Sequence, residues 1–87
     1  MERNGPRIRA NRKQQNALLS LLRTVRKEAG LRQADLAQAL GVPQSYVSKY
    51  ESGERRLDIL ELREVCRAAG ITVAKFGARL EKLVSQL

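Results

Sequence analysis

Neutral hydrogen-bonding side chains gather in one short segment of this chain, QADLAQALGVPQSYVSKYES, which spans residues 33–52. Between its apolar positions stand glutamines, serines and one lysine: Gln33, Gln38, Gln44, Ser45, Ser48 and Lys49. Amide and hydroxyl groups donate and accept hydrogen bonds side by side, as base edges do in the major groove of DNA. Phosphates instead attract Lys and Arg without regard to sequence. The residue types therefore indicate a surface that reads bases.

Two apolar periods flank Gly41-Val42-Pro43 and predict two short helices joined by a tight turn. Ala37 is small where the second helix crosses closely, and Gly41 permits a positive φ at the turn. The inner positions are Leu36, Leu40, Val42, Val47 and Tyr50. This pattern is a helix-turn-helix whose outward face carries Gln44, Ser45, Ser48 and Lys49. The alternative is an ordinary solvated helix face, which the whole pattern and the charge disfavour.

The chain has few of the residue types that enzymes and metal sites use. The chain has no histidine and one cysteine, which removes Ser-His-Asp and Cys-His arrangements and nearly all zinc sites. It has no Gly-rich phosphate loop, and its acidic residues stand singly at helical spacing. Cys66 falls on an apolar stripe, where a small buried hydrophobe is favoured over a reactive thiol. We therefore expect no enzyme, no cofactor and no metal.

The charge balance indicates a polyanionic partner. Seventeen Lys and Arg face nine Asp and Glu, for a net charge of +8, and residues 1–13 carry five basic residues against one acidic residue. These 13 residues include Gly5-Pro6 and lack apolar periodicity, which predicts a flexible basic arm ahead of a domain at 14–87. A nucleic acid suits this charge, whereas a membrane surface is disfavoured because no helix pairs a wide apolar face with a dense basic one.

The cellular location expected from the sequence is the cytoplasm. No apolar run approaches the roughly 20 residues that span a bilayer, and no apolar segment of a secretory signal follows the basic N-terminus. A single cysteine excludes an internal disulfide and fits a reducing compartment.

Five helical segments and the lack of strand-forming runs predict a compact all-α domain. The first helix begins near residue 11 and ends before Gly30. After the helix-turn-helix, a fourth helix starts at Asp58, which forms a capping box with Glu61. The stripe that it is expected to bury is Ile59, Leu62, Val65, Cys66 and Ala69. This helix stops at Gly70, and Thr72 caps a last helix.

Gln33–Ser52 resembles the helix-turn-helix of the phage lambda Cro and repressor family, the xenobiotic-response-element (XRE) type of bacterial regulator. The likeness extends from about Leu18 to Leu80, and VSKYESGERR is similar to the family's recognition helix and following loop. Two positions depart from the family pattern. Arg32 and Pro43 stand where Ser or Thr usually caps the two helices, so each helix start loses about 1 kcal/mol.

The resemblance implies a role for several residues. Gln33 would contact a phosphate and brace Gln44. The residues that would meet base edges are Gln44, Ser45 and Lys49, next to Ser48 on the same face. The residues that would hold the DNA backbone are Ser52, Arg55 and Arg56, with Arg55 also in position to reach a base. Arg26 and Glu51 match a buried ion pair that ties the first helix to the third.

The apolar stripe of the last helix continues further than is usual in this family. It runs through Leu80, Leu83, Val84 and Leu87, and Leu60 falls off the buried stripe of its own helix. Exposed aliphatic side chains in this number are unusual for a monomer, so these five residues are expected to form a homodimer interface. The alternative is that they fold back on the first helix.

The function that fits best is sequence-specific transcriptional regulation, chiefly repression, by a homodimer on a palindromic operator. Its half-sites would lie about 34 Å apart. A different class also fits: an antitoxin that binds a toxin protein and represses its own operon. A third possibility is the controller protein of a restriction–modification system, which binds DNA in any case.

Overall fold

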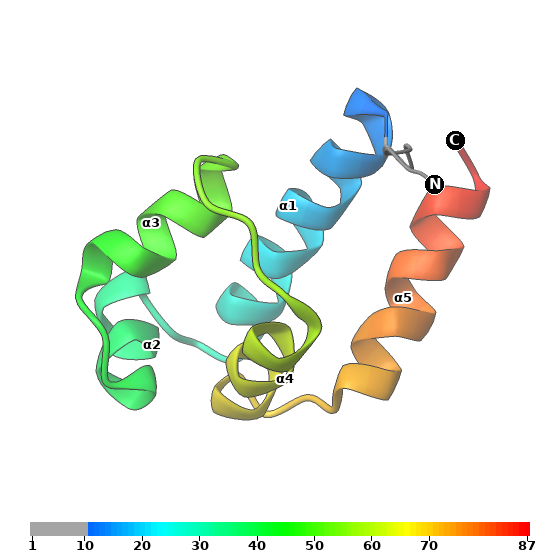
Figure 1. Ribbon diagram of the computed structural model, residues 1–87. Helices are drawn as coiled ribbons and strands as arrows, with labels where there is room; N and C mark the ends of the chain where they lie inside the picture. Colours follow the sequence, from blue (N-terminus) through cyan, green and yellow to red (C-terminus); the bar gives the residue numbers. More distant parts are fainter. Residues whose placement is uncertain (1–10) are drawn as a thin grey trace, which may run out of the picture.

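The computed structural model describes residues 11–87, which form five α-helices and no strand (Figure 1). In chain order the helices are α1 (Arg12–Glu28), α2 (Gln33–Leu40), α3 (Gln44–Ser52), α4 (Ile59–Ala68) and α5 (Val73–Ser85). Figure 1 shows α5 antiparallel beside α1, with α2 and α3 on the other side of α1. Arg79 of α5 also pairs with Glu28 at 2.8 Å. The all-α fold expected from the sequence is confirmed.

The start of α1 corrects the predicted boundary of the arm. Asn11 caps this helix, because its side chain accepts a hydrogen bond from the Gln14 N–H at 2.8 Å. The Gln14 side chain in turn accepts from the Asn11 N–H at 3.0 Å. Arg12 and Lys13 are therefore helical, and an arm of 13 residues is too long. The rest of the predicted arm, residues 1–10, lies outside the described residues.

Both side-chain caps predicted for the last two helices are present. At α4, Asp58 Oδ1 accepts from the Glu61 N–H at 2.7 Å, and Glu61 Oε1 accepts from the Asp58 N–H at 2.9 Å. At α5, the Thr72 hydroxyl accepts from the Lys75 N–H at 3.1 Å. Each cap satisfies a backbone donor that the helix itself leaves without a partner, so these starts follow from local sequence.

The core takes side chains from all five helices. Its buried apolar members are Leu21, Leu22, Val25, Leu36, Ala37, Val47, Tyr50, Val65, Cys66 and Phe76. Burial raises the pKa of the Cys66 thiol, which agrees with its predicted role as a small hydrophobe. No helix within residues 11–87 is long and apolar enough to cross a membrane.

The predicted buried stripe of α4 is wrong at its first residue. Ile59 is 66% exposed, and its neighbour Leu60, which was expected to lie off the stripe, is 71% exposed. The helical spacing does place Ile59 beside Cys66, but burial also requires an element that covers the position. Ile59 occupies the first turn of α4, and no element within residues 11–87 covers that turn.

The apolar stripe of α5 divides into two parts. Leu80 is half-buried and packs against the core, and Val84 is half-buried in a groove that Leu18 of α1 also lines. Leu83 and Leu87 are 40% and 59% exposed. Folding back on α1 therefore accounts for the first pair but leaves the second pair on the surface.

Candidate nucleic-acid interface

The turn between α2 and α3 closes around a left-handed glycine. Gly41 has a φ of 71°, and its N–H donates to the carbonyl of Gln38 at 3.1 Å. The next N–H, that of Val42, donates to the carbonyl of Ala37 at 3.0 Å. Ala37 and Val47 are 3% and 0% exposed, so the two helices are in close contact. These features establish the predicted helix-turn-helix.

One side of α3 is a continuous polar surface, which we call the reading face. Its members are Gln44, Ser45, Ser48, Lys49 and Ser52, and all five are exposed. With 3.6 residues per turn, these five positions fall within about 140° around the helix axis, which makes one broad side of α3. On the opposite side Val47 and Tyr50 are buried, which fixes the outward direction of the polar residues. The structure thus brings together the α3 residues that the sequence singled out.

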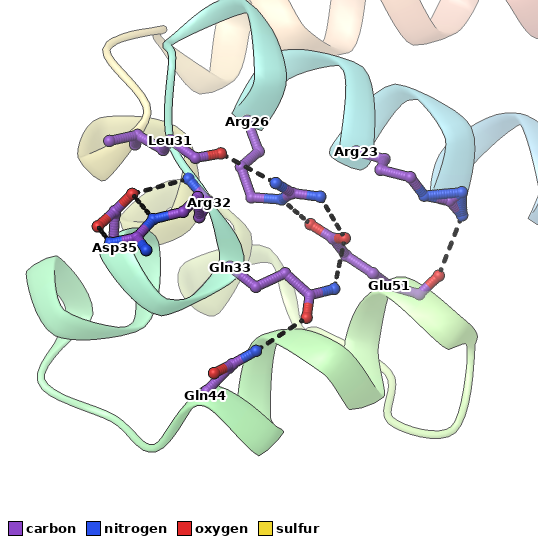
Figure 2. Close-up of polar contacts among 8 residues, drawn as sticks. All are labelled: Arg23, Arg26, Leu31, Arg32, Gln33, Asp35, Gln44 and Glu51. Atoms are coloured by element: carbon purple, nitrogen blue, oxygen red, sulfur yellow. Dashed lines mark hydrogen bonds and ion pairs between the residues drawn. The ribbon is translucent and has the colours of Figure 1, made fainter.

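A buried ion pair connects α1 with the end of α3 (Figure 2). Arg26 Nε and Nη2 donate to the two carboxylate oxygens of Glu51 at 2.7 and 3.1 Å. The two side chains are only 9% and 3% exposed. Hydrogen bonding to Glu51 raises the pKa of Arg26, and a third guanidinium N–H donates to the Leu31 carbonyl at 2.9 Å. Three hydrogen bonds therefore fix the Arg26 guanidinium against Glu51 and Leu31.

The same carboxylate extends a chain of hydrogen bonds to the reading face (Figure 2). Gln33 Nε2 donates to Glu51 Oε1 at 3.0 Å, and Gln33 Oε1 accepts from Gln44 Nε2 at 3.5 Å. The second contact is long and correspondingly weak. It uses one N–H of the Gln44 amide, whose carbonyl oxygen and second N–H have no partner within residues 11–87. These are the two groups that pair with the N6 and N7 edge of adenine.

Asp35 supplies a cap for α2 that sequence reasoning missed. Neither Arg32 nor Pro43 makes a side-chain cap, as expected from their chemistry. Asp35 Oδ2 instead accepts from the Arg32 N–H at 2.9 Å, and both its oxygens accept from the Arg32 guanidinium (Figure 2). These bonds lower the pKa of Asp35 to about 2. The three-residue spacing between Arg32 and Asp35 was the available signal.

The loop after α3 engages Arg55 within the protein. Its Nη2 lies 2.6 Å from Glu61 Oε2, and its guanidinium carbon lies 4.6 Å from the centre of the Tyr46 ring. Glu61 also accepts from the Tyr46 hydroxyl at 3.3 Å. The sequence pattern predicts only a capping role for Glu61. The structure shows that its carboxylate also holds the loop against α3, so Arg55 is not a freely extended side chain.

The other predicted backbone-binding residues differ in their surroundings. The Ser52 hydroxyl donates to the Lys49 carbonyl at 3.0 Å and accepts from the Glu54 N–H at 3.4 Å, which shapes the loop. Arg56 is exposed and forms no ion pair within residues 11–87. Leu60, Leu83 and Leu87 do not belong to this surface, since they lie on α4, on α5 and after α5.

The comparisons with known proteins agree with this geometry. Residues 22–76 match a family model described as helix-turn-helix. An XRE-family like protein from Pseudomonas syringae pv. tomato str. DC3000 is 44% identical, with a TM-score of 0.75 over 80% of this chain and 85% of that one. The clp gene regulator ClgR from Corynebacterium glutamicum is 30% identical, with a TM-score of 0.71 over 84% and 79%.

A more distant likeness supports the fold alone. The restriction-modification controller protein C.Esp1396I is 23% identical, with a TM-score of 0.75 over 85% of this chain and 95% of that one. No curated protein sequence is significantly similar to this chain.

Proposed function

This chain belongs to the XRE-type helix-turn-helix family of DNA-binding transcriptional regulators, and we propose that it is a repressor that binds a palindromic operator as a homodimer. The observation that supports sequence-specific binding most strongly is the bracing of Gln44. The Arg26–Glu51 pair holds Gln33, and Gln33 Oε1 accepts a long hydrogen bond of 3.5 Å from the exposed Gln44 amide. A side chain whose freedom is already restricted before binding loses less of it when it pairs with a base.

The rest of the reading face completes this proposed readout. Ser45 and Ser48 present hydroxyl groups that donate to or accept from several bases, and Lys49 reaches the O6 and N7 acceptors of guanine. Arg56 and the Ser52 turn hold the phosphate backbone beside the reading helix. The net charge of +8 adds an attraction to DNA that does not depend on base sequence.

The proposed dimer uses the aliphatic side chains that the monomer leaves exposed. Leu60, Leu83 and Leu87 are 71%, 40% and 59% exposed. Full burial of a leucine contributes about 1.5–3 kcal/mol, and two-fold symmetry brings in each residue twice. This gain is comparable with an association cost of about 4–15 kcal/mol. Leu80 and Val84, half-buried beside α1, form the inner edge of the same interface.

Base readout is tested by comparing Gln44→Ala with Arg56→Ala. An operator is first selected in vitro from random duplexes, and fluorescence anisotropy then measures binding to it and to a scrambled duplex. We expect Gln44→Ala to lose about 1–3 kcal/mol on the operator alone. Arg56→Ala should weaken binding to both duplexes and lower the salt slope by about one unit.

The matched control is Gln38→Ala, which removes an exposed glutamine of α2 and should bind both duplexes as wild type does. If Gln44→Ala weakens binding to operator and scrambled DNA equally, Gln44 contributes to non-specific affinity and does not recognise a base.

The dimer is tested with the double variant Leu83→Glu, Leu87→Glu in sedimentation equilibrium. Its control is Ala78→Glu, Ser85→Glu, which adds the same charge to exposed positions on the opposite side of α5. Wild type and control should be dimeric at tens of micromolar, while the leucine variant should be monomeric. A monomeric wild type, or a leucine variant that dimerises as well as wild type, would refute the interface.

A further inference from the structure

The carboxylate of Glu61 joins three parts of the chain. Its Oε1 accepts from the Asp58 N–H at 2.9 Å, which belongs to the cap of α4. Its Oε2 accepts from the Tyr46 hydroxyl of α3 at 3.3 Å and from Nη2 of Arg55, in the loop after α3, at 2.6 Å. A capping box uses only the first of these contacts, so the cap does not account for the second oxygen.

The side chain of Arg55 is held at one edge of the reading face. Its guanidinium carbon lies 4.6 Å from the centre of the Tyr46 ring, and its backbone N–H donates to the Lys49 carbonyl at 3.1 Å. Tyr46 precedes Lys49 by three residues, a spacing that makes the two side chains neighbours on the surface of α3. The ring, the backbone contact and the Glu61 carboxylate therefore hold the Arg55 guanidinium on the Lys49 side of the reading face.

Glu61 also balances the charge of Arg55. The two side chains are 32% and 42% exposed, so a DNA phosphate that approaches this guanidinium also meets the carboxylate, which repels it. Arg56, the next residue, has no such counter-charge within residues 11–87. The guanidinium N–H groups of Arg55 that do not face Glu61 can still donate to an uncharged acceptor, such as the edge of a base.

We propose that Glu61 is a positioning residue for DNA recognition, which directs the donors of Arg55 to bases and keeps its charge from phosphates. This inference rests on the proposed function, because it concerns the same DNA interface. Non-specific affinity grows with the number of phosphates that Lys and Arg neutralise, whereas specificity comes from contacts to bases. An arginine that is already neutralised within the protein adds to the second without adding to the first. Glu61 thereby raises the ratio of specific to non-specific binding.

Glu61→Gln separates this role from the cap. Glutamine also serves at the third position of a capping box, so the midpoint of urea unfolding should be nearly unchanged. Because Arg55 loses its counter-charge, fluorescence anisotropy should show several-fold tighter binding to scrambled DNA at about 50 mM salt, with a salt slope steeper by about 0.9. That slope makes the advantage about 3.5-fold smaller at about 200 mM salt. The operator should gain less, so the preference for it should fall by roughly tenfold.

Two control variants test whether Arg55 carries the effect. Glu81→Gln makes the same change in net charge at an exposed position of α5, on the other side of α1 from α3 (Figure 1). It should bind both duplexes as wild type does. In a chain that already carries Arg55→Ala, Glu61→Gln should no longer steepen the salt slope.

The position of Arg55 is measured separately in the free protein. Side-chain NMR should find the Arg55 Nε–H restricted in wild type and mobile in Glu61→Gln. Equal mobility in the two proteins would overturn the inference.

The DNA measurements distinguish this inference from the proposed function. If Glu61→Gln binds scrambled DNA with the affinity and salt slope of wild type, or weakens binding to both duplexes as a lost cap would, the inference is wrong and the proposed function stands. Equal affinity of wild type for operator and scrambled DNA would refute the proposed function. The salt slope of Glu61→Gln on scrambled DNA would then still decide whether Glu61 keeps Arg55 from phosphates. A protein that binds no duplex would refute both.

Discussion

Replacing Glu51 with glutamine is expected to remove a large part of the stability of this domain. The substitution keeps the shape of the side chain but leaves the Arg26 guanidinium, which is 9% exposed, without a counter-charge. The carboxylate of Glu51 now accepts from N–H groups of Arg26 and Gln33 at 2.7–3.1 Å. A glutamine amide would place its own N–H groups opposite some of these donors, where no hydrogen bond can form. Breaking a buried ion pair from one side costs about 3–5 kcal/mol. A chain of 87 residues has about 4–13 kcal/mol in total.

Removing both charges together should be far less harmful. In the double variant Arg26→Met, Glu51→Leu no charge stays buried, and apolar side chains of similar size fill the space. Such replacements are commonly neutral or stabilising, because the desolvation of two ions offsets most of their attraction. The two single variants should therefore each be strongly destabilised, and the double variant should recover most of the loss. The double variant should therefore be several kcal/mol more stable than the sum of the two single effects predicts.

The free energies of unfolding of the wild type, the two single variants and the double variant can be measured by urea unfolding, followed by circular dichroism at about 222 nm. With a slope of about 1–3 kcal/mol per molar, a loss of 3 kcal/mol moves the midpoint down by roughly 1–3 M. Single variants that each cost under about 1 kcal/mol and add in the double variant would refute the reasoning. They would show that solvent screens the pair as it screens a surface ion pair.

The double variant also separates stability from DNA recognition. We expect it to fold, while Gln33 loses its acceptor on Glu51 and so restrains the Gln44 amide less than in the wild type. We expect its preference for operator over scrambled DNA to fall by about tenfold in anisotropy measurements, with non-specific affinity nearly unchanged. Full specificity in this variant would mean that Gln44 needs no bracing.

Three further predictions concern the cap of α2, the loop after α3 and the arm. Arg32 lowers the pKa of Asp35 to about 2, below its unfolded value of 3.8. The contribution of this carboxylate to stability is therefore complete above about pH 4 and disappears as the pH falls toward 2. NMR of the Asp35 carboxyl group should find its titration midpoint near pH 2, and a midpoint near pH 4 would contradict the cap. Gly53→Ala should destabilise the domain by about 1–2 kcal/mol in urea unfolding. Gly53 has a φ of 89°, and an added β-carbon would lie 3.2 Å from a methyl group of Leu19 in α1. The control Gly77→Ala, at an open position within α5, should stabilise the domain by about 0.5–1 kcal/mol. Residues 1–10 carry three arginines and one glutamate. Deleting them should leave the melting temperature nearly unchanged and lower both the affinity for DNA and the dependence of that affinity on salt. A melting temperature lower by several degrees would show that these residues support the fold.

The sequence by itself determined the features that depend on neighbours along the chain. Helix starts follow from pairs three residues apart, which is why the capping box at Asp58 and the Thr72 cap were predicted correctly, and the turn at Gly41 followed from the glycine itself. The outward direction of the reading face also followed, because Val47 and Tyr50 anchor the opposite side of α3. The likeness to a known family added the Arg26–Glu51 pair, two residues that lie 25 positions apart and that no local pattern connects.

Tertiary structure alone decided which apolar and charged side chains are covered. Helical spacing puts Ile59 on a buried stripe, yet no element covers the first turn of α4. The same spacing treats Leu80 and Leu83 alike, and only the position of α1 beside α5 buries one more than the other. Arg55 carries a charge suited to DNA, but α4 brings Glu61 within 2.6 Å of it. Burial and ion pairing depend on which helices meet, and that information lies in contacts between residues far apart in the chain.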